Sequence, residues 1–458
     1  MTRIARNSLS ILMALSTFAC GDGGGGTVDA GAGMDDAGPV ADAAPATDAG
    51  RRDAGPAGND SFETATVVET DTNPGAAETI NPAGESDYFR FEGTAGDWVA
   101  IFTLTEAAAD GTQADTVITL YDSTMTQIAE NDDAQPRTGT DSEVILRLPS
   151  TGTYYYKVQE FSTWAPDMVM GGPVGGRAYA YETSVITLTS ASTGVLIDGE
   201  PGNDAASATA LPTGRDSAFV LGRFDTATDV DVFSLQIPAT AAAPKIFDVE
   251  VMPAGPMGYG ATRSAGRVWV TDAMGTIIAR STIGTGITGV QPSFATTGDI
   301  RIFAEAPSGA AGTNDHYVLK VFTNDENPLE GAAANETLAT AEARALAPVM
   351  GGMGESSFVL ARLPAGDVDY FALEVMAGRR LSVACGSRRD GSGVLGLTAE
   401  VRNAMDMVLT SSTESATEDL FIDGFAVPAA GTYYIRLAGT GQDPEVTGDW
   451  VRCGIRAL

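Results

Sequence analysis

Histidine is almost absent from this sequence, which has a single one, His316, among its 458 residues. Sites that need two imidazoles are therefore excluded, and these include the His-Glu-x-x-His zinc proteases. A serine triad would have to use His316, and no Gly-x-Ser-x-Gly turn supplies its nucleophile. We expect His316 to be an ordinary residue at the edge of a strand.

Positive charge is also scarce. Lys and Arg total 27 against 60 Asp and Glu, which gives a formal net charge of -33. Because Lys and Arg are what bind phosphate backbones, this composition excludes nucleic acid as a partner and disfavours anionic membrane surfaces. A surplus of carboxylates suits divalent cations, but it equally suits the solvated surface of an extracellular protein.

Long apolar runs are missing, and the run Leu9–Leu15 is far shorter than the roughly 20 residues of a membrane-spanning helix. It follows two arginines and precedes Cys20, which is the arrangement of a secretory signal. The segment resembles the signal of bacterial lipoproteins, in which the cysteine is acylated. Thr17 stands where leucine is usual in that pattern, so ordinary signal cleavage is the alternative. We predict a lipoprotein signal at residues 1–20 and lipidation of Cys20.

Residues 21–58 contain repeated Asp-Ala-Gly triplets and no aromatic residue. Such a segment cannot bury enough apolar surface to offset the entropy of ordering. We predict a disordered, acidic linker that separates the folded part from the membrane. The protein is then exported and held by its lipid alone, with the outer membrane or cell surface as the expected location.

After the linker, the same order of signals recurs three times. An acidic-to-aromatic strand start surrounds Asp87, Asp231 and Asp369, and each is preceded by an Asn-Asp or Asn-Glu pair. A Gly-Thr-Tyr-Tyr strand closes the first and third copies, while the second keeps only His316–Val321. We predict three domains, at residues 59–193, 198–323 and 328–458.

Short runs of alternating polar and apolar residues fill each copy, as in Thr116–Tyr121 and Arg267–Val270. Alternation places one face of a strand in a core and the other in water. Convincing amphipathic helices are nearly absent. The sequence therefore predicts an all-β protein made of three tandem antiparallel β-sandwich domains.

The first copy contains Asn59-Asp60, Asp87-Tyr88-Phe89, Leu120-Tyr121-Asp122 with Asn131-Asp132-Asp133, and Gly152-Thr153-Tyr154-Tyr155. This series resembles the bacterial pre-peptidase C-terminal domain, and the other two copies match it less fully. The resemblance implies jelly-roll-like sandwiches of the kind appended to secreted proteases. Related collagenase domains bind matrix protein and calcium. No protease is attached here, so the resemblance implies binding of protein or polysaccharide by the sandwich surface or its loops.

Calcium prefers carboxylate and amide oxygens, and these gather at each strand start. Residues two apart in a strand share a face, so the acidic pairs before and within each strand can share an ion. By resemblance to the collagenase modules, the candidate ligands are Asn59, Asp60, Glu85, Asp87, Asn203, Asp204, Asp229, Asp231, Asn335, Glu336, Asp367 and Asp369. The alternative is that these side chains cap turns through hydrogen bonds to the backbone. Asp132 and Asp133 are a weaker second cation candidate or a solvated turn.

Cys385 and Cys453 both lie in predicted strands of the third copy. Export favours a disulfide between them, which would stabilise the domain by roughly 4 kcal/mol, and two buried thiols are the alternative. The run Gly284–Gly289 has the spacing of a dinucleotide-binding loop. Because no helix follows it to hold a pyrophosphate, we interpret it as an ordinary loop.

These observations favour a non-catalytic cell-envelope lipoprotein whose modules bind protein or polysaccharide and are stabilised by calcium. A glycoside hydrolase that uses two carboxylates is the enzymatic alternative. It would need aromatic side chains in one groove beside paired carboxylates, and the tryptophans are scattered at Trp98, Trp164, Trp269 and Trp450. A purely structural envelope spacer is the third possibility.

Overall fold

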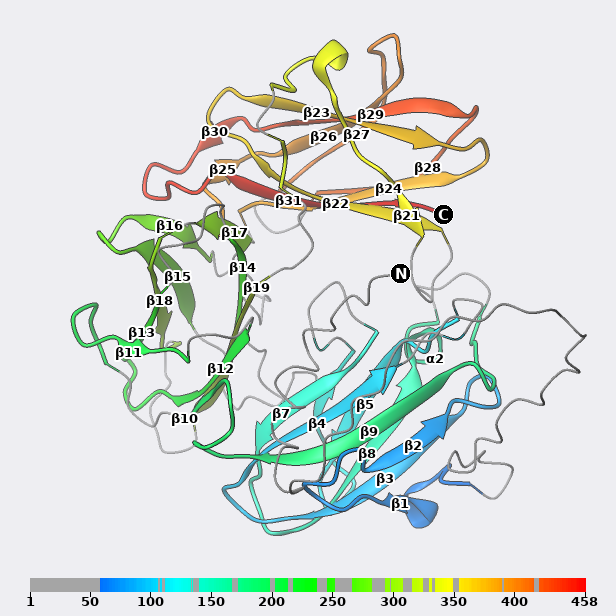
Figure 1. The fold of residues 1–458 in the computed structure, drawn as a ribbon, viewed down its shortest axis with the longest axis vertical. Coiled ribbons are helices and arrows are strands. Elements are labelled where there is room, and N and C mark those ends of the chain that lie inside the picture. The colour runs from blue at the N-terminus through cyan, green and yellow to red at the C-terminus, as the bar shows by residue number, and fades with distance from the viewer. Residues whose placement is uncertain are drawn as a thin grey trace, which may run out of the picture.

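A computed structural model of the chain shows three β-sandwiches in succession (Figure 1). It describes residues 58–105, 108, 112–132, 134, 140–166, 172–197, 202–212, 217–236, 245–251, 266–281, 293–296, 298–307, 315–323, 329–331, 334–348, 354–388, 391–415 and 420–458. In these ranges each helix is about one turn long: η1 (Phe62–Thr64), α2 (Phe161–Trp164) and η2 (Leu338–Thr340). None of the described helices has the length and apolar character needed to cross a membrane. The all-β prediction is confirmed.

The first sandwich packs a sheet of order β1-β3-β8-β5-β6 on a sheet of order β2-β9-β4-β7. All of its strand pairs are antiparallel except β1 with β3. Its strands are β1 (Thr66–Val67), β2 (Ala76–Thr79), β3 (Ser86–Gly93), β4 (Trp98–Thr105), β5 (Thr116–Tyr121), β6 (Gln127–Asn131), β7 (Glu143–Arg147), β8 (Gly152–Glu160) and β9 (Ala180–Leu188).

The second sandwich has sheets of order β11-β13-β18-β15-β16 and β10-β12-β19-β14-β17. Two short strands, β10 and β11, run parallel to their neighbours, and the other pairs are antiparallel. Its strands are β10 (Val195–Ile197), β11 (Thr209–Ala210), β12 (Ser217–Arg223), β13 (Val230–Leu235), β14 (Lys245–Val251), β15 (Arg267–Asp272), β16 (Ile277–Arg280), β17 (Ser293–Thr296), β18 (Ile300–Glu305) and β19 (His316–Thr323).

The third sandwich has sheets of order β20-β23-β29-β26-β27 and β21-β22-β31-β24-β28, with a small β25-β30 ladder beside them. Here too the first short strand, β20, runs parallel to its neighbour. The strands are β20 (Glu342–Ala343), β21 (Ala347–Pro348), β22 (Glu355–Arg362), β23 (Val368–Val375), β24 (Arg380–Gly386), β25 (Val394–Leu395), β26 (Thr398–Arg402), β27 (Val408–Thr413), β28 (Leu420–Ala426), β29 (Gly431–Ala438), β30 (Gly441–Gln442) and β31 (Trp450–Ala457).

The three sandwiches share one strand order, in which β8, β18 and β29 occupy the centre of the first sheet. This corrects the sequence alignment of the second copy. His316–Val321 lies in β19, which takes the place of β9, whereas the counterpart of the Gly-Thr-Tyr-Tyr strand is β18 (Ile300–Glu305). The alignment failed because β9 and β19 each carry a tyrosine, Tyr181 and Tyr317, in an alternating strand, and alternation alone does not identify a strand's place in a sheet.

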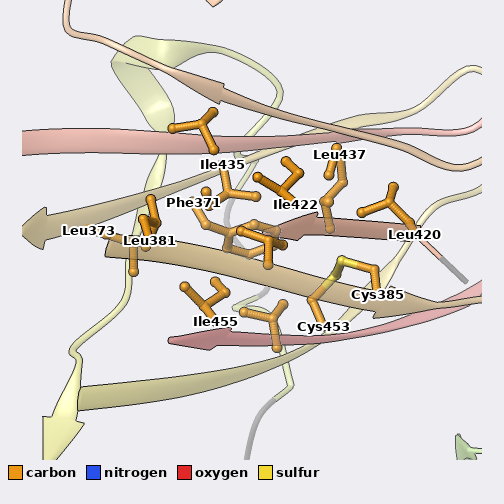
Figure 2. Packing of buried hydrophobic residues seen from close by; sticks show 14 of the residues in the cluster. Phe371, Leu373, Leu381, Cys385, Leu420, Ile422, Ile435, Leu437, Cys453 and Ile455 are labelled. Carbon is orange, nitrogen blue, oxygen red and sulfur yellow. A yellow bond between two sulfur atoms is a disulfide. The ribbon is translucent and has the colours of Figure 1, made fainter. Parts of the chain in front are cut away.

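Each sandwich buries its own core between its two sheets. In the first, the inward positions of β3 and β8 place Phe89 and Phe91 against Tyr156 and Tyr154. The third core is mainly aliphatic and includes Phe371 and the sulfurs of Cys385 and Cys453, as Figure 2 shows. Burying one large apolar side chain stabilises the fold by about 1.5–3 kcal/mol, so these layers hold each sandwich together.

The outer faces of the second sheets hold the first and second sandwiches together. Trp98 and Ile145 of the first sandwich form one apolar cluster with Phe219 and Val318 of the second. Within this contact, Lys320 Nζ lies 2.8 Å from the Glu143 carboxylate, and both side chains are almost fully buried. The same ammonium donates to the Ala134 carbonyl oxygen at 3.1 Å. A buried, hydrogen-bonded ion pair fixes the register of such a contact.

A second interface joins the edge strand β16 to loops of the third sandwich. The amide of Thr447 donates to the Ile277 carbonyl at 2.9 Å, and the Arg280 guanidinium pairs with the carboxylates of Asp443 and Glu445. At Gly448 a Cβ atom would lie 1.8 Å from the Ile278 carbonyl oxygen, so a side chain there is excluded. The second sandwich therefore contacts both of the others directly (Figure 1).

Candidate functional site

The strand-start aspartates are buried in all three sandwiches. Asp87, Asp231 and Asp369 are 0%, 0% and 2% exposed, in β3, β13 and β23. Each precedes a core phenylalanine by two residues, so strand alternation points all three carboxyls toward the interior. Burial disfavours the charged form of a carboxyl group unless hydrogen bonds or cations compensate for lost water.

A tyrosine from the opposite sheet contacts this carboxyl in two of the sandwiches. The Tyr181 hydroxyl donates to Asp87 Oδ2 at 2.5 Å, and the Tyr317 hydroxyl donates to Asp231 Oδ2 at 2.7 Å. In the third sandwich, Val451 occupies the corresponding position of β31 and has no hydroxyl to offer. The shared aspartate therefore has different partners in different copies.

Burial raises the pKa of Asp87 to about 8, against a smaller lowering by the Tyr181 hydrogen bond. The negative charges of Glu85, Glu78 and Asp60 add to the increase. Burial also raises the pKa of Asp369 to about 8, and there the main neighbouring charges are Glu330 and Asp367. One carboxylate oxygen of Asp87 and one of Asp369 are buried without a hydrogen-bond partner.

The asparagines of the start signal behave differently from copy to copy. Asn59 and Asn335 are buried, and their carbonyl oxygens accept from the amides of Tyr88 and Tyr370, which directly follow the aspartates. In the second sandwich the equivalent carbonyl belongs to Gly202, one residue before the Asn203 of the sequence alignment. A backbone hydrogen bond therefore aligns the start segment with its strand in each sandwich, and this alignment requires no asparagine side chain.

The remaining start residues face solvent. Asp60, Asn203, Asp204 and Glu336 are exposed. Asp204 Oδ1 accepts from the amides of Ala206 and Ser207, at 2.9 and 2.8 Å. That contact is the turn-capping role that the sequence analysis left as the alternative for such residues.

The residues two positions before the buried aspartates also bond to nearby backbone. Glu85 accepts from the amide of Asn81, and Asp229 accepts from the amide of Asp225 at 2.9 Å. Asp367 accepts from the amide of Val368, also at 2.9 Å. Across the described ranges, no three His, Cys, Asp or Glu side chains are close enough together to hold a metal ion. As arranged, the predicted calcium ligands do not form a complete coordination sphere.

Other predicted residues have clear places. Cys385 and Cys453 form a disulfide with Cα atoms 4.1 Å apart (Figure 2). His316 lies at the interface of the first two sandwiches, with its Nε2 3.2 Å from Arg147 and its ring edge-on to Trp98. Asp132 accepts from the Ser142 hydroxyl through its carbonyl. Cys20, the linker at residues 21–57, Asp133 and the run Gly284–Gly289 lie outside the described residues.

An aromatic cluster on the outer face of the first sheet was missed by the sequence analysis. The ring of Phe62, from η1, lies edge-on to Tyr88, Tyr121 and Tyr155, with centroids 4.8, 5.1 and 5.5 Å away. All four side chains are partly exposed. We call these four residues the aromatic face. A signal was present, because in Tyr154-Tyr155 the alternation of a strand must direct one ring inward and the next outward.

Polar groups adjoin the aromatic face. The Thr119 hydroxyl donates to Glu130 Oε2 at 3.0 Å, on the same side of the sheet. Burial lowers the pKa of Lys157, while the charge of Glu130 opposes that change. Burial likewise raises the pKa of Tyr121 to about 12, so its phenol is a hydrogen-bond donor at neutral pH. The aromatic face thus combines partly exposed rings with a polar pair, Thr119 and Glu130, that is buried beside them.

The corresponding faces of the other sandwiches carry different chemistry. In the second, Trp269 stacks on Phe303 with centroids 4.8 Å apart, and Arg267 lies over the tryptophan ring. In the third, Arg402 and Arg436 both pair with Glu400. A phenylalanine ring in contact with three tyrosines is thus found on the first sandwich among the described parts of these faces.

The match to a known family falls on the first sandwich, the one that carries the aromatic face. Residues 85–160 match the family model of the bacterial pre-peptidase C-terminal domain. This segment runs from the start of β3 to the end of β8, and it contains three of the four residues of the aromatic face. The first sandwich therefore contains a pre-peptidase C-terminal domain, a non-catalytic type of module. No curated protein matches the chain.

Solved structures with some likeness include the CUB1-EGF-CUB2 domain of human MASP-1/3, at 8% identity and a TM-score of 0.17. That match covers 53% of this chain and 100% of the other. Tripeptidyl peptidase 2 matches at 11% identity and a TM-score of 0.16, over 80% of this chain but 32% of its own. The Macrobrachium rosenbergii nodavirus gives 10% identity, 57% and 95% coverage and a TM-score of 0.15.

Proposed function

We propose that this chain is a non-catalytic lipoprotein of the bacterial cell envelope that binds protein or polysaccharide through the aromatic face of its first sandwich. The observation that supports the proposal is the packing of Phe62 with Tyr88, Tyr121 and Tyr155 on an outer sheet face. Aromatic rings of this kind provide large contact area with little loss of side-chain entropy on binding. The family match over the same strands supports a binding module rather than an enzyme.

The hydrolase alternative receives no support from the tryptophans. Trp98 lies in the contact between the first two sandwiches, and Trp450 packs against the core of the second. Trp164 contacts Phe161, and Trp269 stacks on Phe303. Because the tryptophans occupy separate places, they do not line one groove beside a pair of carboxylates.

Attachment belongs to the same proposal. An acylated Cys20 would hold the protein on the membrane, and the acidic linker that follows would let the sandwiches reach ligands beyond it. Metabolic labelling with an alkyne-bearing fatty acid tests this directly. We expect the label on the wild-type chain and none on the Cys20→Ala variant; a labelled variant would contradict the assignment.

Binding can be tested on the complete chain, purified in detergent, with gelatin as a protein probe and a soluble glucan as a polysaccharide probe. We expect Tyr155→Ala to weaken binding to one of them by about tenfold, a typical effect for a central aromatic contact. Tyr434→Ala is the matched control, because Tyr434 occupies the same strand position in the third sandwich. Equal losses in both variants, or no loss in Tyr155→Ala, would refute the proposal.

Calcium is a second proposal, favoured by the partnerless buried oxygens of Asp87 and Asp369. A bound cation would compensate for burying their charge, although the neighbouring carboxylates would have to move closer to complete its shell. We expect millimolar calcium to raise the melting temperature of the wild-type chain and to have a smaller effect on the Asp87→Asn, Asp369→Asn double variant. If calcium leaves the wild-type melting temperature unchanged, the calcium proposal is refuted.

A further inference from the structure

The outer face of the sheet β21-β22-β31-β24-β28 carries an apolar row in the third sandwich. Its register places Phe358 beside Gly454, Gly454 beside Ala384, and Ala384 beside Phe421, on four adjacent strands. Phe421 is 55% exposed, Ala384 is exposed, and Phe358 and Gly454 are partly exposed. We call these four residues the third-sandwich row. Two phenylalanines thus lie at its ends, with small residues between them.

The same sheet face is covered in the other two sandwiches. In the first it presents Trp98, Ala100 and Ile145, and in the second it presents Phe219, Leu221 and Val318. These side chains bury one another in a single cluster. Within this molecule, therefore, the face of one sandwich packs on the corresponding face of another.

The row corresponds to positions beside that apolar cluster, where the buried ion pair of the contact lies. Ala384 lies six residues after the turn glycine Gly378, as Phe102 lies six residues after the turn glycine Gly96. The cross-strand partner of Phe102 is Glu143, so Phe421 stands where the first sandwich has Glu143. Glu143 is the residue that reaches Lys320 of the second sandwich.

The second sandwich gives the same correspondence. Phe219 and Lys320 are cross-strand partners there, as Phe358 and Gly454 are in the third. Phe219 is 8% exposed in the contact with the first sandwich, whereas Phe358 is partly exposed and is not a member of that cluster among the described residues. The third sandwich therefore replaces the buried ion pair of the contact by apolar and small residues and leaves them at the surface.

From this equivalence we infer that the third-sandwich row is a self-association surface, which docks on the same row of a second copy of this chain. The exposed rim has both signs of charge, with Arg380 and Arg456 on one side and Asp423 on β28. A two-fold contact places a surface against its own copy, so a rim with both signs can pair with itself. The disulfide Cys385–Cys453 lies directly beneath Ala384 and Gly454 and holds their strands together.

This face also continues an interface already present. On β31, Arg452 reaches the Asp248 carboxylate of the second sandwich at 3.1 Å, and Gly454 of the row follows two residues later on the same side of the sheet. Association through the row would therefore extend a sheet face that already uses arginine–carboxylate contacts. It would place two lipid anchors on one particle, which strengthens membrane retention. The inference does not depend on the aromatic face or its ligand.

Sedimentation equilibrium of the complete chain in density-matched detergent tests it, over a wide range of protein concentration. We expect a monomer–dimer equilibrium for the wild-type chain. The Phe421→Ser and Phe358→Ser variants should each weaken the association constant by about tenfold or more, as loss of a central aromatic anchor does. Because Phe421 is more than half exposed, its variant should keep the wild-type melting temperature.

Met405→Ser is the matched control, because Met405 is 74% exposed on the third sandwich but belongs to the turn between β26 and β27 of the other sheet. It should leave the association constant unchanged. A wild-type chain that stays monomeric throughout would overturn the inference. So would a dimer that survives both phenylalanine substitutions, or one that Met405→Ser weakens equally.

Discussion

The first and third sandwiches close the same end of their cores with different chemistry. In the third, the cross-strand pair Cys385 and Cys453 forms a disulfide. The corresponding pair in the first, counted from the turn glycines that precede β4 and β24, is Thr103 and Thr183. Thr103 opens a buried hydroxyl network, with Thr116 Oγ1 at 2.6 Å and Ser142 beyond it.

The strand-start aspartates repeat this contrast. Asp87 has the Tyr181 hydroxyl, whereas Asp369 has no equivalent tyrosine and lies among other carboxylates. Strand order and burial are thus common to the two sandwiches, but the partners of equivalent residues are not. The comparison teaches that a repeated fold preserves where a side chain points more faithfully than what it contacts.

The largest expected effect concerns pH. The pKa of Asp87 and of Asp369 is raised to about 8, so the folded chain binds these protons more tightly than the unfolded chain does. Their contribution to stability is full below about pH 4 and is lost as the pH rises toward 8, at about 1.4 kcal/mol per unit of pKa shift. Denaturant unfolding at a series of pH values measures it.

Asp87→Asn and Asp369→Asn isolate the effect from other carboxylates. Each variant should match the wild-type chain near pH 4 and exceed its unfolding free energy progressively up to about pH 8, since the amide carries no charge. If the difference between variant and wild type stays constant with pH, the buried aspartates are not the groups that titrate. A larger effect at Asp369 would show that its carboxylate neighbours, rather than burial alone, distinguish the two sandwiches.

The second expected effect concerns the disulfide. Replacing Cys385 and Cys453 together by serine should cost about 4 kcal/mol in the third sandwich, because the bond closes a loop of 68 residues in the unfolded chain. Thr103→Val is the comparison in the first sandwich, where it removes one hydroxyl from the network. Calorimetry that shows the same thermal stability with and without the disulfide would contradict this prediction.

The smallest expected effect concerns the tyrosine that contacts Asp87. Tyr181→Phe removes the hydroxyl that donates to Asp87 at 2.5 Å, so the buried carboxyl loses a hydrogen bond. We expect the free energy of unfolding to fall by about 1–3 kcal/mol. Tyr317→Phe should behave alike in the second sandwich, where the hydroxyl lies 2.7 Å from Asp231. A melting temperature that is unchanged in both variants would show that these hydrogen bonds contribute nothing to stability.

Much of the architecture could be predicted from the sequence because strand alternation is a local property. The all-β class and the resemblance of the first copy to a pre-peptidase C-terminal domain followed from short alternating runs and motifs, and the family match at residues 85–160 confirms the latter. The inward direction of Asp87 was not predicted, although its spacing of two residues to Phe89 implies it. The alignment of His316–Val321 failed, since neighbouring strands can carry the same pattern.

The candidate sites depended more heavily on the tertiary structure. The sequence gathered asparagines and carboxylates at each strand start, but the fold turns Asp60, Asn203 and Glu336 outward and uses Asp204 to cap a turn. The aromatic face brings Phe62 beside Tyr121 and Tyr155, which are distant in sequence and belong to three different elements. No local pattern indicates that such residues meet.

By itself the sequence determined the period of the strands, the exclusion of histidine chemistry and the positions of the cysteines, because each of these follows from local spacing or composition. Only the tertiary structure decided which sheet faces are covered and which are open. Trp98 and Phe219 are buried while Phe421 is exposed, although all three lie on the outer faces of equivalent sheets. The physical reason is that exposure depends on which sandwich packs against which, a long-range property that alternation along one strand does not encode.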